Sequence, residues 1–272
     1  MRLQVKDVSF TYGSVPALEN ITFKVSGGEV LGIIGPNGSG KSTLLRCLAR
    51  VLRPRTGTIF LDGKNVAALH GYELGRMIGY VPPPGGQAGF PTTVVETVLQ
   101  GRRPYLTWGV SRHDLEVVSA ALGYLGLTPL AERLLSELSS GQQQKVFLAR
   151  ALAQEPEVLL FDEPTATLDI RYQLEVMALI RRLATEEGRT VVAVLHDLNL
   201  AGRFADRLLL LHEGRIFAAG KPAAVLTPAN LRAVYGVEAV VTEAPWGIQV
   251  TPVAPATAAE KEARKEAALA RA

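Results

Sequence analysis

The first thirty residues show a two-residue alternation of apolar and polar side chains. The alternation runs across Leu3–Phe10 and again across Ile21–Val25, with a turn-forming stretch at Tyr12–Ser14 between them. Because successive side chains of a strand point to opposite faces, this pattern predicts paired strands with one buried face. Thr58–Leu61, followed by the turn dipeptide Asp62-Gly63, predicts another strand. The chain is therefore expected to begin with a small antiparallel sheet.

Short apolar runs then alternate with stretches of helical spacing. Glu29–Ile34 is an apolar strand that enters a glycine-rich turn, and Ser42–Val51 follows with helical spacing. Two further apolar strands, Val158–Phe161 and Val191–Leu195, flank the helical stretch Ile170–Ala184. This order is typical of parallel βαβ units, so the pattern predicts an α/β core.

The remaining segments have weaker patterns. Residues 90–154 lack β-branched runs and predict a helical subdomain inserted into the core. Asp206–Ala219 predicts a hairpin around Glu213-Gly214, and Pro245–Gly247 a last turn. The alanine-rich end, Ala254–Ala272, is either a frayed helix or disordered.

Composition narrows the class of protein. The chain has 272 residues, 47% hydrophobic and 20% charged, which excludes wholesale disorder. Its 29 basic and 26 acidic residues leave a charge of +3, too small for a dedicated nucleic-acid surface. No stretch approaches the roughly 18 consecutive apolar residues of a membrane span, and the start lacks a signal-peptide pattern. The single cysteine, Cys47, excludes an internal disulfide, fits a reducing cytoplasm and has a spacing that favours a packed helix position.

The strongest chemical motif lies between the first apolar core strand and its helix. Gly35–Thr43 satisfies GxxxxGK[ST], the pattern of a phosphate-binding loop. Its glycines let successive N–H groups point at phosphate oxygens, and the helix N-terminus adds positive potential. Lys41 is expected to contact the β- and γ-phosphates, and Ser42 to bind Mg²⁺. The predicted nucleotide-binding residues of this loop are Pro36, Asn37, Gly38, Ser39, Gly40, Lys41, Ser42 and Thr43.

Further candidates follow two other core strands. Asp162 and Glu163 end the strand Val158–Phe161, which suits Asp162 for holding Mg²⁺ and Glu163 for accepting a proton from an attacking water. His196 follows Val191–Leu195, at the edge where ligand sites of parallel sheets gather. We therefore expect Lys41, Glu163 and His196 to be the catalytic side chains, with Ser42 and Asp162 as metal ligands.

A second phosphate-binding surface is predicted at the start of a helix. Ser139, Ser140, Gly141 and Gln142 are small or polar and precede helical spacing, so N–H groups and a free hydroxyl are available there. By itself this stretch is equally an ordinary serine-capped helix start.

Taken in order, these motifs resemble the ATP-binding subunit of ABC transporters, and the likeness spans Leu3 to Val241. The stretch Leu138–Gln142 resembles the family's signature motif, which makes the assignment more specific than a phosphate-binding loop alone. The resemblance implies a P-loop NTPase (RecA-like) α/β core with an N-terminal antiparallel β subdomain and an inserted helical signature subdomain. It also implies an ATP-binding domain over residues 1–241, with a helical subdomain at about 90–154, and a C-terminal extension over 242–272.

The resemblance assigns roles that the residues alone do not. It implies that Tyr12 stacks on adenine, that Ala166–Asp169 is the D-loop and that His196 is the switch histidine. It further implies that two copies face head to tail, so that Ser139–Gln142 of one copy serve the ATP of the other. The expected cofactors are ATP and Mg²⁺. The expected partners are a second copy, permease subunits and, indirectly, an extracytoplasmic solute-binding protein, at the cytoplasmic face of the membrane, with no nucleic acid.

Two segments resemble a subgroup of the family. Gly101–Tyr105 after Val94–Val98, and Leu226–Leu231 leading to Tyr235–Val237, look like importers of iron chelates, haem and vitamin B12. The alternative is that Arg102, Arg103 and Tyr105 only form a solvated helix end.

Two positions depart from the family pattern. Ser140 stands where a second glycine is expected, and a positive φ there would strain the serine by roughly 1 kcal/mol. Pro83 stands where the Q-loop glutamine is expected, and Gln87 is a candidate substitute. The leading hypothesis is an importer ATPase. The alternatives are a soluble ABC ATPase of the cluster-assembly type, an importer ATPase for another solute, and a regulatory ATP-binding module with a degenerate site.

Overall fold

The computed structural model describes residues 2–83 and 91–256, and its first layer is an antiparallel sheet. The strand order is β2-β1-β4-β5. Leu3 on β1 pairs with Val25 on β2 and with Leu61 on β4, so β1 lies between them. The N-terminal antiparallel sheet is confirmed. Its strands are β1 (Leu3–Tyr12), β2 (Val15–Val25), β4 (Thr56–Leu61) and β5 (Lys64–Asn65).

The second layer is a six-stranded sheet in the order β10-β9-β3-β8-β7-β6. Five of its strands are parallel, and β10 pairs antiparallel with β9 in the predicted hairpin. Every residue of β3, β7 and β8 is buried, which explains why these strands are apolar runs and do not alternate. The strands are β3 (Val30–Ile34), β6 (Ile78–Val81), β7 (Val158–Asp162), β8 (Thr190–Val194), β9 (Arg207–His212) and β10 (Arg215–Gly220).

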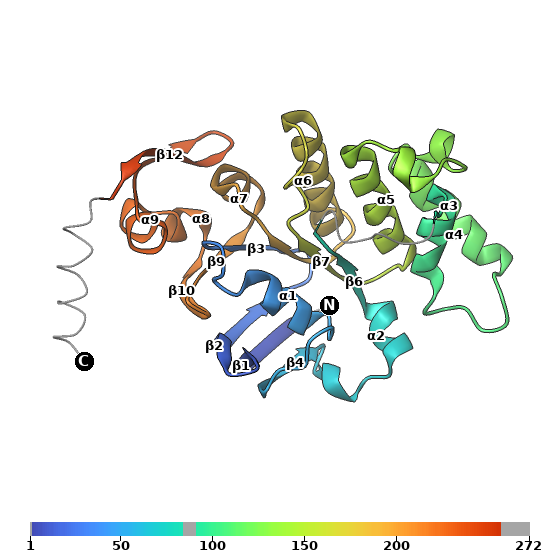
Figure 1. Ribbon diagram of the computed structural model, residues 1–272, viewed down its shortest axis with the longest axis horizontal. Coiled ribbons are helices and arrows are strands. Elements are labelled where there is room, and N and C mark those ends of the chain that lie inside the picture. Colours follow the sequence, from blue (N-terminus) through green and yellow to red (C-terminus); the bar gives the residue numbers. More distant parts are fainter. Residues whose placement is uncertain (1, 84–90, 257–272) are drawn as a thin grey trace.

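Helices cover both faces of this sheet (Figure 1). Side chains of α1 (Lys41–Leu48) pack with the N-terminal sheet and one face of β3, while α6 (Ile170–Thr185) and α7 (Leu198–Phe204) pack on the other. The α1 helix ends before the expected Val51, because Arg50 has a φ of 55° and its guanidinium donates to the carbonyl oxygen of Val66 at 3.1 Å. The α/β class with a P-loop core is confirmed.

The inserted subdomain is helical in its described part and lies at one end of the molecule (Figure 1). Its helices α3 (Val94–Leu99), α4 (Arg112–Tyr124) and α5 (Ser140–Ala153) enclose a separate apolar core. Arg102 at the end of the 3₁₀ turn η2 (Gln100–Arg102) is 1% exposed, so a solvated helix end is wrong for this residue, although Arg103 is exposed. Sequence analysis did not predict α2 (Gly71–Met77) and β6, which are among the shortest elements of the core.

A hairpin completes the described chain after α8 (Pro222–Val225) and α9 (Pro228–Tyr235). Strand β11 (Val237–Ala244) and strand β12 (Gly247–Pro255) turn at the expected Pro245-Trp246, and the buried side chains of Ile248 and Val250 belong to the core that contains α7. The hairpin continues across residue 241, so residues 242–255 complete a strand pair that starts inside the expected domain. The tail 257–272 lies outside the described residues. No described helix combines the length and the apolar character needed to cross a membrane.

Candidate active site

The glycine-rich loop connects β3 to α1 as predicted. Gly40, the residue before α1, has a φ of 100°, and a Cβ added there would lie 2.5 Å from the carbonyl oxygen of Ala17. Only glycine fits this turn, which aims the first N–H groups of α1 at the loop. Pro36 accepts a hydrogen bond from the Ser39 amide at 3.2 Å, while Asn37 and Gly38 are exposed.

Lys41 is buried inside the loop that it follows. Its Nζ donates to the carbonyl oxygens of Gly35 and Pro36, each at 2.9 Å, and the residue is 5% exposed. Burial lowers the pKa of Lys41, and the negative charges of Glu163 and Asp162 act in the opposite direction. The ammonium is therefore fixed at the loop, within the field of both carboxylates.

The expected metal ligands Ser42 and Asp162 are in direct contact. Ser42 Oγ donates to Asp162 Oδ1 at 2.8 Å, and Tyr80 Oη donates to Asp162 Oδ2 at 3.2 Å. Asp162 is fully buried; burial raises its pKa, and the two hydrogen bonds act to lower it. Arg46 in turn forms a hydrogen bond with Tyr80. Sequence reasoning missed Tyr80, because the strand β6 that carries it was not predicted, and Arg46, because no motif marks its place on α1.

Glu163 and His196 meet at the carboxyl edge of neighbouring parallel strands. Glu163 follows β7, His196 lies two residues beyond β8, and Asp162 pairs in register with Val194. Glu163 Oε1 and His196 Nε2 are 2.6 Å apart, and both side chains are partly exposed, at 27% and 40%. Glu163 has a φ of 55°, a left-handed backbone conformation that residues other than glycine rarely adopt. Its carboxylate is therefore held in place at a conformational cost.

Three more residues lie in or beside the loop. Tyr12 is 47% exposed; its Oη lies 3.4 Å from Thr43 Oγ1, and its ring packs edge-on against Phe10 at 4.9 Å. Ser39 Oγ is buried and has no hydrogen-bond partner among the described residues. Burial raises the pKa of Tyr235 to about 12, and a hydrogen bond with the backbone of Gly35 acts to lower it. Tyr235 thus contacts the loop. Sequence reasoning noted this residue only in a segment that resembles a subgroup of the family.

The predicted signature residues begin α5. Ser139 caps the helix: its Oγ accepts from the amide of Gln142 at 3.3 Å, and the side chain of Gln142 accepts from the amide of Ser139 at 3.0 Å. Ser140 is helical and has no positive φ, so the strain that a left-handed serine would carry does not arise. Gly141 lies against the ring of Tyr172. Within the described residues, no hydrogen bond joins this helix start to the loop Gly35–Thr43.

Of the remaining predicted residues, Asp169 lies in the described structure and Gln87 does not. Asp169 caps α6, where its Oδ1 accepts from the amide of Tyr172 at 3.0 Å. Ser140 Oγ lies 3.4 Å from the carbonyl oxygen of Thr167, so the segment 166–169 touches the start of α5. Gln87 lies outside the described residues, and its role stays a prediction.

Relatives with curated names share most of the length of this chain. An uncharacterised ABC transporter ATP-binding protein of Methanocaldococcus jannaschii is 45% identical over 88% of this chain and 93% of that protein. The petrobactin import ATP-binding protein FpuD of Bacillus anthracis is 40% identical over 89% of each chain. The ferric enterobactin transport ATP-binding protein FepC of Escherichia coli is 38% identical over 90% of each.

Solved structures agree in fold. A metal-chelate type ABC transporter in an inward-facing conformation has a chain with a TM-score of 0.81 and 32% identity, covering 92% of this chain and 96% of that one. A dimeric ATP-binding cassette bound to ADP and phosphate has a TM-score of 0.72 and 31% identity, covering 81% and 98%. The family model described as ABC transporter matches residues 18–166. With sequence, fold and site geometry in agreement, this chain belongs to the ABC transporter family.

Proposed function

We propose that this chain is the ATP-hydrolysing subunit of an importer for metal chelates or cobalamin. The single observation that carries the proposal is the convergence of Lys41, Asp162, Glu163 and His196 at one sheet edge beside the glycine-rich loop. Three separate segments of chain supply these groups, and each has the chemistry that phosphoryl transfer requires.

ATP is proposed to bind with its phosphates on the loop. The N–H groups at the start of α1 and the Lys41 ammonium supply positive potential, and Tyr12, half exposed beside Thr43, offers a ring face to adenine. Lys41 already donates to two carbonyl oxygens of the loop, so its position is set by the protein.

The donor set at Ser42 and Asp162 fits Mg²⁺. A hydroxyl and a buried carboxylate stand 2.8 Å apart, and both are the hard oxygen ligands that Mg²⁺ prefers together with water and substrate phosphates. Mg²⁺ bound there would neutralise charge on the β- and γ-phosphates. Tyr80 donates to the other carboxylate oxygen of Asp162 and so fixes its orientation.

Hydrolysis is proposed to use Glu163 as the base. A water molecule attacks the γ-phosphorus, the bond to the ADP oxygen breaks, and the Glu163 carboxylate accepts the proton of the water. His196, 2.6 Å from Glu163, holds that carboxylate in place. The left-handed backbone of Glu163 serves the same end, since it aims the side chain into the site.

Dimerisation completes the site in this proposal. Ser139–Gln142 form a capped helix start with no hydrogen bond to the loop of their own chain, which is the arrangement expected of a surface that serves a second copy. The structural relatives include dimeric cassettes, one of them bound to ADP and phosphate.

The transported solute is inferred from relatives. Their names include petrobactin, ferric enterobactin and cobalamin import, and a metal-chelate type transporter is among the structural relatives. We infer a peripheral position at the cytoplasmic face of the membrane, with permease subunits as direct partners and an extracytoplasmic solute-binding protein as an indirect one.

The test of the proposed base is Glu163→Gln, which keeps the size of the side chain and removes its basicity. ATP turnover should fall at least a hundredfold, while binding of a fluorescent ATP analogue changes less than threefold. Lys41→Ala is the companion variant, in which nucleotide binding itself should fail. Unchanged turnover in Glu163→Gln would exclude this residue as the base.

The importer class is tested in cells that lack this subunit. Uptake of labelled ferric siderophore, haem and cobalamin is compared after return of the wild-type chain or the Lys41→Ala variant, together with its permease. Uptake of at least one solute should require the intact lysine. If the chain purifies with soluble assembly proteins and no permease, the cluster-assembly alternative replaces this proposal.

A further inference from the structure

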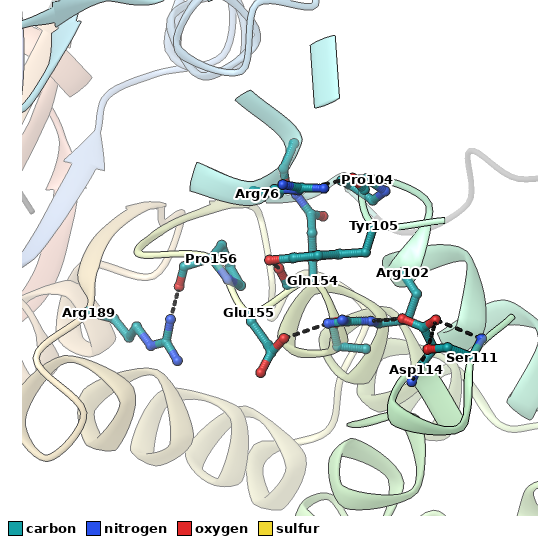
Figure 2. A network of polar contacts seen from close by, with 12 residues as sticks. Arg76, Arg102, Pro104, Tyr105, Ser111, Asp114, Gln154, Glu155, Pro156 and Arg189 are labelled. Atoms are coloured by element: carbon teal, nitrogen blue, oxygen red, sulfur yellow. Dashed lines mark hydrogen bonds and ion pairs between the residues drawn. The ribbon is translucent and has the colours of Figure 1, made fainter. Parts of the chain in front are cut away.

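Arg102 is the largest fully buried side chain in the described part of the protein. It ends the turn η2, and its guanidinium has three partners (Figure 2). Nε donates to Asp114 Oδ1 at 2.9 Å, while Nη1 donates to the carbonyl oxygen of Ala153 at 2.8 Å and to Glu155 Oε2 at 2.6 Å. A buried guanidinium needs acceptors and negative charge of this kind, because an unpaired charge in the interior is strongly destabilising.

The three partners of Arg102 come from different parts of the fold. Asp114 also caps α4, since its Oδ2 accepts from the amide of Ser111 at 3.0 Å. Ala153 is the last residue of α5, and Glu155 lies in the short connection from α5 to β7. One planar side chain therefore fixes the start of α4, the end of α5 and the approach to the strand that carries Asp162.

Tyr105 extends these contacts to the core (Figure 2). Its ring lies between two guanidinium groups, 3.9 Å from that of Arg102 and 4.8 Å from that of Arg76 on α2. Its hydroxyl donates to the carbonyl oxygen of Gln154 at 3.1 Å, and the side chain of Gln154 donates to the carbonyl oxygens of Gly75 and Ile78. The inserted subdomain is thus tied to α2 and β6 through guanidinium–ring contacts and hydrogen bonds.

Close packing leaves little freedom of movement between the inserted subdomain and the core. A Cβ added at Gly101 would collide with the carbonyl oxygen of Arg150 on α5, so η2 and α5 are in backbone contact. On the core side, Arg189 before β8 donates to the carbonyl oxygen of Pro156, which holds the connection that follows Glu155 (Figure 2).

At its other end, its N-terminus, α5 begins with Ser140 and is capped by Ser139. A helix of 14 residues is about 21 Å long, so a tilt of about 5° at its C-terminus displaces its N-terminus by roughly 2 Å. A misplacement of that size costs a catalytic arrangement about a hundredfold in rate.

We propose that Arg102 is a positioning residue for ATP hydrolysis: it sets the direction of α5 and thereby where Ser139–Gln142 meet the nucleotide of a second copy. The inference rests on the proposed dimeric ATPase. It predicts that Arg102 variants retain nucleotide binding to the chain's own loop and lose the later step, in which two copies close on ATP.

The experiment compares Arg102→Lys with Arg112→Lys. Lysine keeps the charge but has no planar fork to serve three acceptors at once. Arg112 lies on α4, is 93% exposed in its side chain and pairs with Glu116 at 3.0 Å, so it receives the same chemical change at a solvated position. Each variant is made in the wild-type chain and in the Glu163→Gln chain, where bound ATP should hold the dimer together.

Arg102→Lys should lower kcat at least tenfold while the KM for ATP and the binding of a fluorescent ATP analogue stay within twofold. In the Glu163→Gln chain at saturating ATP, it should raise the protein concentration needed for dimerisation at least tenfold, measured by analytical ultracentrifugation. Arg112→Lys should match its parent in all of these measurements. Equal kcat and equal dimerisation in Arg102→Lys and its parent would overturn the inference.

Two further outcomes are separable. If the Glu163→Gln parent itself does not dimerise with ATP, the dimeric function fails and this inference fails with it. If Arg102→Lys yields no folded protein, Glu155→Ala replaces it, because the Glu155 side chain is 46% exposed and its truncation removes one of the three hydrogen-bond acceptors of Arg102. The same split between unchanged binding and at least threefold weaker dimerisation is then expected, and its absence overturns the inference.

Discussion

Individual side chains at this site are fixed by contacts within the protein, before any ligand binds. Lys41 donates to its own loop, Ser42 and Tyr80 hold the two oxygens of Asp162, and His196 contacts Glu163. Preorganised groups of this kind do not need to reorient when charge develops on a transferring phosphoryl group. The geometry therefore supports catalysis by position and electrostatics, with Glu163 as the group that accepts a proton.

Cys47 provides a prediction at this scale. Burial raises the pKa of its thiol to about 12, and the residue is 1% exposed on α1. At pH 8 the reactive thiolate is then about a thousandfold rarer than in an exposed cysteine, so the native chain should resist a thiol reagent such as DTNB. One thiol per chain should react after addition of guanidinium chloride. Rapid reaction of the folded protein would show that α1 opens readily.

The sequence identified these site residues better than it identified their neighbours. Two motifs, Gly35–Thr43 and Asp162-Glu163, directly follow apolar strands. Their chemistry can therefore be predicted from the sequence without a structure. Tyr80, Arg46 and Tyr235 belong to no such motif, because they reach the site through tertiary packing of β6, α1 and α9. Contacts of that type depend on which strands become neighbours, and a single sequence does not state this.

Among the elements, α4 and α5 owe their ends to side chains that cap them. Ser111 with Asp114, and Ser139 with Gln142, each form a reciprocal pair at a helix start. The sequence predicted helices over 90–154 because apolar spacing and the absence of β-branched runs are local properties. It did not predict the short α2 and β6, since seven and four residues are too few for a clear period.

Asp114 gives the helical subdomain a predicted response to acid. Hydrogen bonds from Ser111 and Arg102 lower the pKa of Asp114 from 3.8 to about 2. The carboxylate therefore contributes stability that is complete above about pH 4 and is lost as pH falls towards 2; by linkage the contribution is about 2 kcal/mol of unfolding free energy.

Urea unfolding of the wild type and of Asp114→Asn from pH 7 to pH 2 measures this contribution. The variant should be less stable at pH 7, and the difference should shrink between pH 4 and pH 2. Glu116→Gln, on the exposed face of the same helix, is the control and should follow the wild type throughout. A difference that stays constant with pH would contradict the account.

For the whole molecule, the order of strands explains how distant segments form one site. In the sheet order β3-β8-β7, the loop after β3, His196 and the pair Asp162-Glu163 all follow the carboxyl ends of adjacent parallel strands. The alternation of apolar strands and helices predicted such a sheet, but not its order. Nor did it show that β11 and β12 close the other end, because their half-buried pattern is weak.

The C-terminal hairpin should contribute to the stability of the whole core. Val250 on β12 is 4% exposed in the cluster that includes α7, whereas Val253 on the same strand is 66% exposed. Val250→Ala should lower the free energy of unfolding by about 2 kcal/mol through lost burial and an added cavity. Val253→Ala should change it by less than about 0.5 kcal/mol. Equal effects in urea unfolding would mean that the hairpin is not part of the cooperative core.

The left-handed backbone at Glu163 places stability and the proposed chemistry in conflict. Glycine at this position would relieve a steric cost of roughly 1 kcal/mol and would also remove the carboxylate that touches His196. A selection that rewards heat resistance alone would therefore favour replacements here that leave the protein folded but without the proposed base. Directed evolution of a hardier variant must therefore screen for ATP hydrolysis at every round.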